Sequence, residues 1–397
     1  MTTATTATQT LPRAAPARVL ALGAYLKNTA CLLDGATVRW STLHGDLSTP
    51  EACVALEASA HELLRIAGGH IDAVAHDLHP DFESTRLAIS IARRLGVPAI
   101  GVQHHHAHVG VVQAEHGDHG RVIGLALDGV GLGTDRTAWG GELLGVQGPA
   151  WQRIGHLTPL ALPGGDIAAR EPWRMGAAAL HALGRDREIV PRFAPVVGDA
   201  LARGVRDMLA RGLNCPPTTS AGRWFDALAG LLGFSVRQAT EAEAAIALER
   251  AAARWLDANP AASVEAAGLS HDRGPGDMSG LDLRALVASC IDSGGDVGAT
   301  AARFHLGLAA GLAHAAIDAA RDSGTTAIVL AGGCFFNRVL TRHVVARIEA
   351  AGLEVRQPGG ATGPGDAGLA LGQAWIAAHT LAADRVATIA KEEPACA

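Results

Sequence analysis

Four histidines fall within five consecutive residues of the sequence, where a predicted strand at 99–103 ends and a helix is expected to begin. His104 and His108 are four residues apart, so on a helix they share one face and their imidazoles can reach one divalent ion. Imidazole suits zinc and iron, and we therefore favour a metal site over a solvated or helix-capping histidine cluster. His105 and His106 point away from that face and are predicted to contact substrate or to support the ligands.

A site with two histidines needs further ligands, and two aspartates are well placed to supply them. Asp128 ends a buried apolar run, residues 121–128, and Asp366 lies in the glycine-rich segment 363–368 at the predicted start of a helix. Taken alone, Asp366 is better explained as a helix N-cap, and Asp128 is equally well explained as part of an Asp-Gly turn. With the two histidines they predict a metal centre whose four side chains also carry the catalysis.

Three glycine-rich turns could bring backbone N–H groups against phosphate or sugar oxygens. They are residues 129–135, beginning with Gly129, then 140–142, and 331–333 with Asn337 one turn into the following helix. A P-loop motif is absent from the sequence, and the Rossmann spacing is not met in a strand–helix–strand context. Each turn alone is explained by ordinary turn glycines, whereas the three together favour a bound nucleotide.

Charge and an aromatic ring gather in segment 163–174 of a mostly apolar chain. Its Asp166 and Arg174 are typical either of a capped helix with surface ion pairs or of a docking site for an anionic group of a substrate. Cys334 follows two glycines near a predicted helix start, where a thiol pKa can be lowered. We interpret Cys334 as a small core residue and not as a nucleophile.

The elements expected to position these residues alternate between β-rich runs and helical patterns, which indicates an α/β architecture. Three antiparallel strands are expected within 19–40, followed by helix, strand, helix and strand to residue 103. The same order begins again at residue 121, which indicates an internal duplication into two lobes. A mostly helical insertion at about 167–322 interrupts the second lobe, and ligands are expected in the cleft where strand carboxyl ends converge.

The predicted lobes span residues 18–118 and 119–380, with a disordered tail at 1–17 and a tail at 381–397 that has little to pack against. The first tail is rich in Thr and Ala and shows neither the basic nor the apolar region of a leader peptide.

The 397 residues are 48% apolar and 18% charged, with a formal net charge of −6. The apolar content excludes disorder of the bulk, and the acidic balance argues against nucleic acid as a partner. Six cysteines without a CxxC pair indicate neither a disulfide framework nor a zinc ribbon. No stretch is apolar for long enough to span a bilayer, so we expect a cytoplasmic protein with no membrane partner.

These motifs together resemble the C-terminal half of the HypF carbamoyltransferases of nickel–iron hydrogenase maturation. The resemblance covers residues 19–378 and rests on ordered matches at 26–29, 77–81, 102–108, 127–129, 139–142, 163–166, 171–174, 222–226 and 370–373. That half is similar to Kae1, the threonylcarbamoyl-transfer enzyme of tRNA modification. The resemblance therefore implies two duplicated actin-like ATPase lobes of the ASKHA, RNase H-like class. Arg136 stands where the family usually has glycine.

The resemblance also implies ligands. A divalent metal, iron or zinc with magnesium as a further candidate, would be held by His104, His108 and Asp366, with Asp128 close by. A nucleotide of the ATP or AMP type would lie across Gly222, Asp226, Gly332 and Gly333.

The activity implied by the resemblance is carbamoyl transfer. In the family, carbamoyl phosphate and ATP yield carbamoyl adenylate in an upstream domain, and this half passes the carbamoyl group to the C-terminal cysteine of HypE. The metal would polarise the carbamoyl oxygen, the thiolate would attack, and AMP would leave. The acylphosphatase-like, zinc-finger and YrdC-like modules of the family do not appear in this sequence. We therefore expect carbamoyl adenylate to come from a partner, such as a separate YrdC-like protein, or carbamoyl phosphate to be turned over or hydrolysed directly.

Two alternatives remain open at this point. One is an O-carbamoyltransferase or threonylcarbamoyltransferase acting on another acceptor, although the acidic balance argues against tRNA. The other is a non-catalytic paralogue that binds HypE or a nucleotide without turnover.

Overall fold

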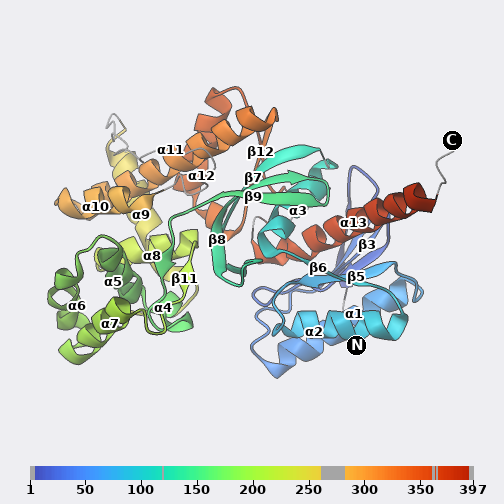
Figure 1. Ribbon diagram of the computed structural model, residues 1–397, viewed down its shortest axis with the longest axis horizontal. Coiled ribbons are helices and arrows are strands. Elements are labelled where there is room, and N and C mark those ends of the chain that lie inside the picture. Colours follow the sequence, from blue (N-terminus) through green and yellow to red (C-terminus); the bar gives the residue numbers. More distant parts are fainter. Residues whose placement is uncertain (1–4, 119, 261–281, 360–362, 364, 393–397) are drawn as a thin grey trace.

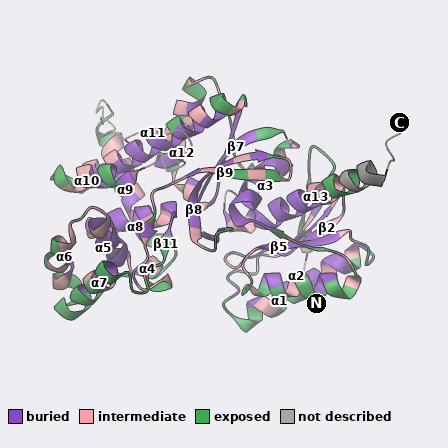
Figure 2. Ribbon diagram, viewed as in Figure 1, coloured by how far each residue is buried: buried purple, intermediate pink, exposed green. Residues whose placement is uncertain are grey.

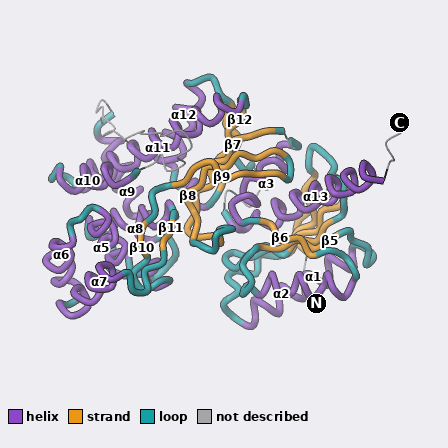
Figure 3. The backbone as a smooth tube through the Cα atoms, viewed as in Figure 1, coloured by secondary structure: helices purple, strands orange, loops and turns teal. Residues whose placement is uncertain are grey.

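The computed structural model describes residues 5–118, 120–260, 282–359, 363 and 365–392. Two β-sheets with helices on their faces form two lobes, and the last helix returns from the second lobe to the first (Figures 1 and 3). The first sheet has the order β1-β4-β3-β2-β5-β6. Its strands are β1 Thr5–Thr10, β2 Val19–Ala21, β3 Cys31–Asp34, β4 Thr37–Ser41, β5 Ala73–Asp77 and β6 Ala99–Val102. The helices that follow in the same part of the chain are α1 Pro50–Ile66, α2 Glu83–Leu95 and α3 His104–His116.

The second sheet has the order β10-β11-β8-β7-β12-β13, and β9 pairs with β8 beside this path. Its strands are β7 Arg121–Leu132, β8 Ala138–Gln147, β9 Ala150–His156, β10 Leu160–Ala161, β11 Pro217–Thr218, β12 Ala327–Ala331 and β13 Glu354–Arg356. In each sheet three antiparallel strands are extended by two parallel ones, β4-β3-β2-β5-β6 in the first and β9-β8-β7-β12-β13 in the second. The expected duplication into actin-like ATPase lobes is confirmed.

Helices dominate between β10 and β12, as the sequence predicts, although the short β11 crosses back to join the sheet. They are α4 Asp166–Arg170, α5 Pro172–Ala182, α6 Ile189–Val197, α7 Asp199–Arg211, α8 Ala221–Leu231, α9 Glu243–Ala258, α10 Leu283–Asp292 and α11 Val297–Ser323. Residues 261–281 of the predicted insertion lie outside the described residues. The remaining helices are α12 Arg338–Ala350 and α13 Leu369–Glu392, with 3-10 turns η1 Asp186–Glu188, η2 Gly333–Phe336 and η3 Asp366–Gly368.

Most residues of the central strands are buried (Figure 2), and since successive residues of a strand point to opposite faces, both faces of each sheet are covered. In β7, Ile123 and Leu125 join the apolar cluster formed with the insertion helices, whereas Val122 and Ala126 join the cluster formed with α3. In β2, Leu20 packs with α1 and α2, and its neighbours pack with α13. Each sheet is thus buried on two sides, as a partly parallel sheet requires.

Two helices exchange places between the lobes. Helix α3 follows the first sheet in sequence but packs on β7, β8 and β12, and α13 follows the second sheet but packs on β2, β3 and β5. They also pack against each other, where an added Cβ on Gly372 would lie 1.8 Å from the carbonyl oxygen of Ala107. The predicted lobe boundaries at 118 and 380 follow chain order, which does not reveal which sheet each of these two helices covers.

The predicted tails also differ from the structure. Residues Thr5–Thr10 form β1, which pairs antiparallel with β4, and Leu11 is buried. Helix α13 continues to Glu392, and the partly buried Leu381 packs against the first sheet's core. Both segments gain order from tertiary contacts that their weak local patterns do not indicate. Arg136, where the family pattern has glycine, adopts a φ of 64°, in the left-handed region that favours glycine.

Candidate metal centre

The histidine run begins α3 immediately after β6. Gln103 is the N-cap, and its side-chain oxygen accepts a hydrogen bond of 2.9 Å from the backbone N–H of His106. This cap fixes where the helix starts, and His104 and His108 consequently lie one turn apart, with ring centroids separated by 5.0 Å. Both imidazoles are buried.

Four side chains from three segments meet at this point: the two histidines from α3, Asp128 from β7 and Asp366 from the start of η3. Oδ2 of Asp128 lies 3.2 Å from Nε2 of His104 and 3.3 Å from Nε2 of His108. Oδ1 of Asp366 lies 3.9 Å and 3.5 Å from the same two nitrogens. The structure thus brings together all four residues that the sequence analysis proposed as ligands, one potential ligand atom from each lying within 4.8 Å of the others.

These spacings suit one bound ion. Ligand bonds of ~2.1 Å in a tetrahedral site place neighbouring donor atoms about 3.4 Å apart, close to the separations observed here. Two imidazoles with two carboxylates form a donor set for zinc or iron, whereas magnesium prefers oxygen ligands. The residues present therefore fit a divalent transition metal.

Asp77 contacts the His104 ring on the side opposite the other ligands. The sequence analysis assigned it no role. It ends β5, and its Oδ2 lies 2.7 Å from Nδ1 of His104. Its other carboxylate oxygen accepts a hydrogen bond of 2.9 Å from the backbone N–H of His79. With Nδ1–H donated to Asp77, Nε2 of His104 is left to face the ligand site. An acidic residue at the end of a buried strand, the same signal that indicated Asp128, could have revealed it.

Charge within the cluster follows from burial and from close pairing. Burial alone lowers the pKa of His104, but hydrogen bonds with Asp128 and Asp77 outweigh it and raise the pKa well above its ordinary value. Against the same effect of burial, Asp128 and Asp366 raise the pKa of His108. Burial alone raises the pKa of Asp128, whereas the two imidazoles hold it well below its usual range. A metal ion entering the site must therefore displace protons from the histidines.

A pocket of about 290 Å³ opens beside the cluster, between the first lobe and the insertion. Its lining comprises Leu26, Asp128, Gly129, Val130, Ala169, Arg170, Arg223, Gln238, Ala239, Thr240, Glu241, Ala242 and Asp366. A Cβ added to Gly129 would meet nothing within 4 Å, so this glycine faces open space. Gly222 lies close to Gly129: a Cβ added to Gly222 would lie only 3.1 Å from the Cα of Gly129. The absence of a side chain at Gly222 thus lets the start of α8 reach the pocket wall.

Asp226 reaches the pocket only through its neighbours. It is buried, pairs with Arg223 at 2.8 Å and accepts a hydrogen bond of 3.2 Å from Gln238, both of which line the pocket. Burial raises the pKa of Asp226. Its observed contacts orient Arg223 and Gln238.

The glycines after β12 serve the backbone. Gly332 has a φ of 97°, and an added Cβ would lie 2.3 Å from the carbonyl oxygen of Leu127. The N–H of Gly333 donates a hydrogen bond of 3.2 Å to Oδ1 of Asp128 and so helps to hold that ligand. Asn337 caps α12 and donates from Nδ2 to Nε2 of His305 at 2.9 Å. Their contact with a nucleotide stays a prediction.

Two of the other candidates, Arg174 and His105, have internal partners. Arg174 is buried, with Nε 2.6 Å from Glu171, and Asp166 is exposed. Nδ1 of the buried His105 lies 3.0 Å from Nε2 of Gln103, and burial together with the charge of His104 lowers its pKa. Burial raises the pKa of the Cys334 thiol, which agrees with its interpretation as a packing residue. A substrate contact by Asp166, Arg174 or His105 stays a prediction.

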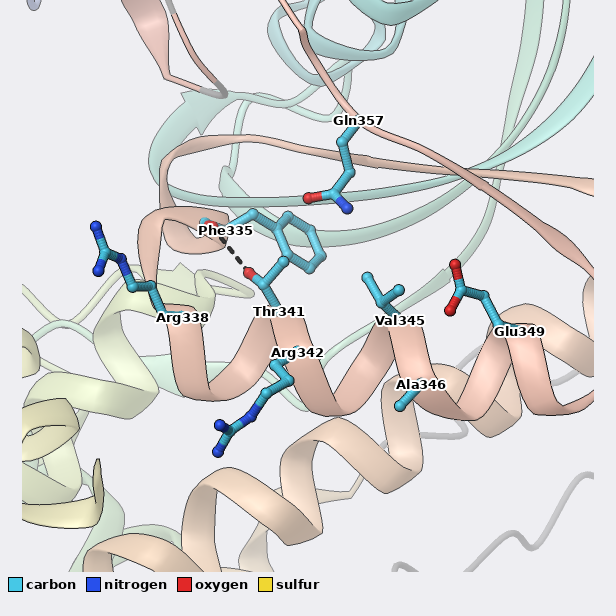
Figure 4. Close-up of a pocket in the computed structure, with 8 residues that line it drawn as sticks. All are labelled: Phe335, Arg338, Thr341, Arg342, Val345, Ala346, Glu349 and Gln357. Atoms are coloured by element: carbon cyan, nitrogen blue, oxygen red, sulfur yellow. Dashed lines mark hydrogen bonds between the residues drawn. The ribbon is translucent and has the colours of Figure 1, made fainter. Parts of the chain in front are cut away.

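A second and larger cavity, about 470 Å³, runs along the outer face of α12 (Figure 4). It is lined by Phe335, Arg338, Thr341, Arg342, Val345, Ala346, Glu349 and Gln357. Among these described lining residues there is one carboxylate and no histidine or cysteine, so this groove offers no comparable ligand set.

Two family matches cover most of the chain. Residues 14–115 match the "HypF Kae1-like domain", and residues 124–373 match the "Carbamoyltransferase, Kae1-like Domain, second subdomain". Within the described residues, every helix is too short or too polar to cross a membrane.

Several curated relatives and solved structures are similar to the chain. It is 55% identical over 373 residues to a "Carbamoyltransferase HypF homolog" of Cupriavidus necator, covering 94% of each sequence. It is 42% identical to "Carbamoyltransferase HypF" of Rhizobium leguminosarum bv. viciae over 89% of this chain and 44% of that protein. A crystal structure of full-length HypF, described as phosphate- and nucleotide-bound, superposes with a TM-score of 0.82 at 29% identity, covering 94% of this chain and 47% of that one. The chain thus spans nearly the whole of the first relative and about half of the other two.

Proposed function

Because the chain belongs to the HypF carbamoyltransferase family, we propose that it transfers a carbamoyl group to the C-terminal cysteine of HypE for cyanide-ligand synthesis in hydrogenase maturation. The donor is carbamoyl adenylate, ultimately made from carbamoyl phosphate and ATP. The observation that carries the proposal is the convergence of His104, His108, Asp128 and Asp366 beside a pocket between the lobes. Such a constellation suits transfer of an acyl-type group.

Each cluster residue has a defined part in this proposal. The four ligands would hold a zinc or iron ion, which would supply Lewis-acid stabilisation of the negative charge that develops on the carbamoyl oxygen. Asp77 holds the His104 imidazole with Nε2 toward the site, and the N–H of Gly333 orients Asp128. Arg223 and the open face at Gly129 offer charge and room for the donor, while the HypE thiolate attacks the carbamoyl carbon and AMP leaves.

The test is transfer to the thiol itself. Purified chain loaded with zinc or iron is incubated with HypE, carbamoyl phosphate and ATP, with and without a separately purified YrdC-like protein. Mass spectrometry of the HypE C-terminal peptide then measures the carbamoylated cysteine. We expect modification by the parent chain and none by His108→Ala; equal modification by both would contradict the proposal.

The same assay, repeated with a hydroxyl acceptor or tRNA added and its products analysed, separates the alternatives. Carbamoylation of a hydroxyl acceptor or of tRNA, with HypE unmodified, would indicate another acceptor. HypE binding without any product would indicate a non-catalytic paralogue.

A further inference from the structure

Lys27 bridges the two walls of the pocket beside the metal centre. Its Nζ lies 2.8 Å from Oε2 of Glu241, which approaches from the loop between α8 and α9. Leu26 and Glu241 both line the pocket, so this contact closes its edge between the first lobe and the insertion. No role was assigned to Lys27 in the metal centre.

The segment carrying Lys27 is held more firmly than an edge ion pair requires. Lys27 adopts a φ of 45°, a conformation that non-glycine residues rarely take. The next residue, Asn28, is buried and donates hydrogen bonds to the carbonyl oxygens of Leu22 and Ala24 at 2.8 Å and 2.7 Å. Thr29 donates a hydrogen bond of 2.7 Å to the carbonyl oxygen of Ala367, the residue after the ligand Asp366. These hydrogen bonds fix the backbone around Lys27 relative to the segment that carries Asp366.

Composition adds a second, independent observation. Of the 33 Lys and Arg residues in the chain, only Lys27 and Lys391 are lysines. An ammonium group is a compact point charge on a flexible stem, whereas a guanidinium is a planar fork. A chain that uses arginine for all but two of these positive charges thus has one of its two ammonium groups at the edge of this pocket.

The ion pair with Glu241 does not by itself account for this arrangement. The two side chains are 49% and 55% exposed, and a pair exposed to this degree contributes little to stability. Burial lowers the pKa of Lys27, but Glu241 and the charges of Asp366 and Asp128 outweigh that effect, so the group stays an ammonium at neutral pH. A cation in the metal site would neutralise those two aspartates and leave the positive charge of Lys27 free for an anion.

We propose that the Lys27 ammonium exchanges Glu241 for a phosphate oxygen of the carbamoyl donor and thereby positions the donor's leaving group beside the metal centre. This inference rests on the proposed function for the identity of the donor. The shared chemistry is a phosphate monoanion or dianion, supplied either by carbamoyl phosphate or by the adenylate.

The test uses the opposite signs expected at the two ends of the pair. In calorimetric titration of the zinc-loaded chain with inorganic phosphate and, separately, with AMP, Lys27→Gln should weaken binding roughly tenfold, the loss of one charge-assisted hydrogen bond. Glu241→Gln should tighten binding about two- to fivefold, because it removes the competing carboxylate. Lys27→Arg should stay within about threefold of the parent, since it keeps the charge. The arm with the larger effect identifies the source of the phosphate.

A matched control lies on α7, where Arg203 and Asp199 form a pair that is 56% and 59% exposed. Arg203→Gln and Asp199→Asn should change neither titration. If Lys27→Gln and Glu241→Gln weakened the binding of phosphate or AMP alike, or if neither changed it, the ion pair would only connect the two lobes. That result would overturn the proposal. Absence of phosphate and AMP binding by the parent would overturn it as well. If the parent chain and its variants bound phosphate and AMP as expected but the parent transferred no carbamoyl group to HypE, only the proposed function would be contradicted.

Discussion

The pocket between the lobes and the groove along α12 differ in a way that volume does not reveal. The groove is the larger, at about 470 Å³ against about 290 Å³, but its lining comes from α12, with Phe335 from η2 and Gln357 from just after β13. The interlobe pocket adjoins a cluster that joins α3, β7 and η3, with charged groups largely removed from water. Burying a charged group costs free energy unless the group is paired and hydrogen-bonded. A cluster of buried charged groups therefore indicates a functional site better than an open hollow does.

Removal of one metal ligand should have the largest effect on the interlobe site and none on the α12 groove. His108→Ala should strongly reduce bound zinc or iron, because it removes one of the two imidazole donors that favour a transition metal over magnesium. Elemental analysis of the purified protein measures this. Arg342→Ala, in the α12 groove, is the matched control and should leave the metal content unchanged. Undiminished metal in His108→Ala would refute the assignment of the site.

The crossing of α3 and α13 should be nearly as sensitive, because it brings the ligands together. In Gly372→Ala the new Cβ would overlap the carbonyl oxygen of Ala107, a backbone atom, and we expect a loss of at least about 3 kcal/mol in the free energy of unfolding. Urea denaturation measures it. Gly204→Ala in α7 meets nothing within 4 Å and should instead stabilise the protein by about 0.5–1 kcal/mol. Equal unfolding midpoints for the two variants would contradict the close crossing.

Asp77 tests whether support beneath the cluster matters as well as the ligands. Asp77→Asn keeps the shape but weakens the orientation of His104, and metal affinity should fall about 10- to 100-fold. Competition with a chelating dye gives the affinity. Asp81→Asn, at an exposed carboxylate, serves as control. An unchanged affinity in Asp77→Asn would show that the contact is only structural.

The smallest expected effect is a loss of stability at acid pH that depends on His305, which contacts the N-cap of α12. Burial lowers the pKa of His305 to about 4, and its neutral ring donates to Ala301 and accepts from Asn337, the N-cap of α12. The unfolded chain binds the proton near pH 6.5, so stability is full above that pH and is lost as pH falls toward 4. At pH 5 the loss should be about 2 kcal/mol.

Thermal unfolding of parent and His305→Gln at pH 7 and pH 5 measures this contribution. The variant should lose less stability on acidification, whereas His70→Asn, at an exposed histidine, should behave as the parent does. Identical pH dependence in parent and His305→Gln would show that the buried ring does not resist protonation.

Much of the fold could be predicted because the strands of both sheets have clear local sequence patterns. The continuous apolar runs of β2 and β7, which are buried at nearly every position, and the glycines at the ends of strands predicted both sheets and their duplication. The edge strand β1 could not be predicted, since Thr and Ala give no alternation and only pairing with β4 orders them. Nor could the sequence show that Arg174 has Glu171 as its partner or that Asn337 caps a helix beside His305.

Local sequence accounts for what depends on nearest neighbours: the shared helical face of His104 and His108, and the position of Asp128 at a strand end. The exchange of α3 and α13 between the lobes, which brings Asp366 to the same site, depends on packing between distant segments and has no local signature. The same holds for Asp77 beneath His104 and for Lys27 facing Glu241. Residue types set which chemistry is available, and the exchange of the two helices decides where it is assembled.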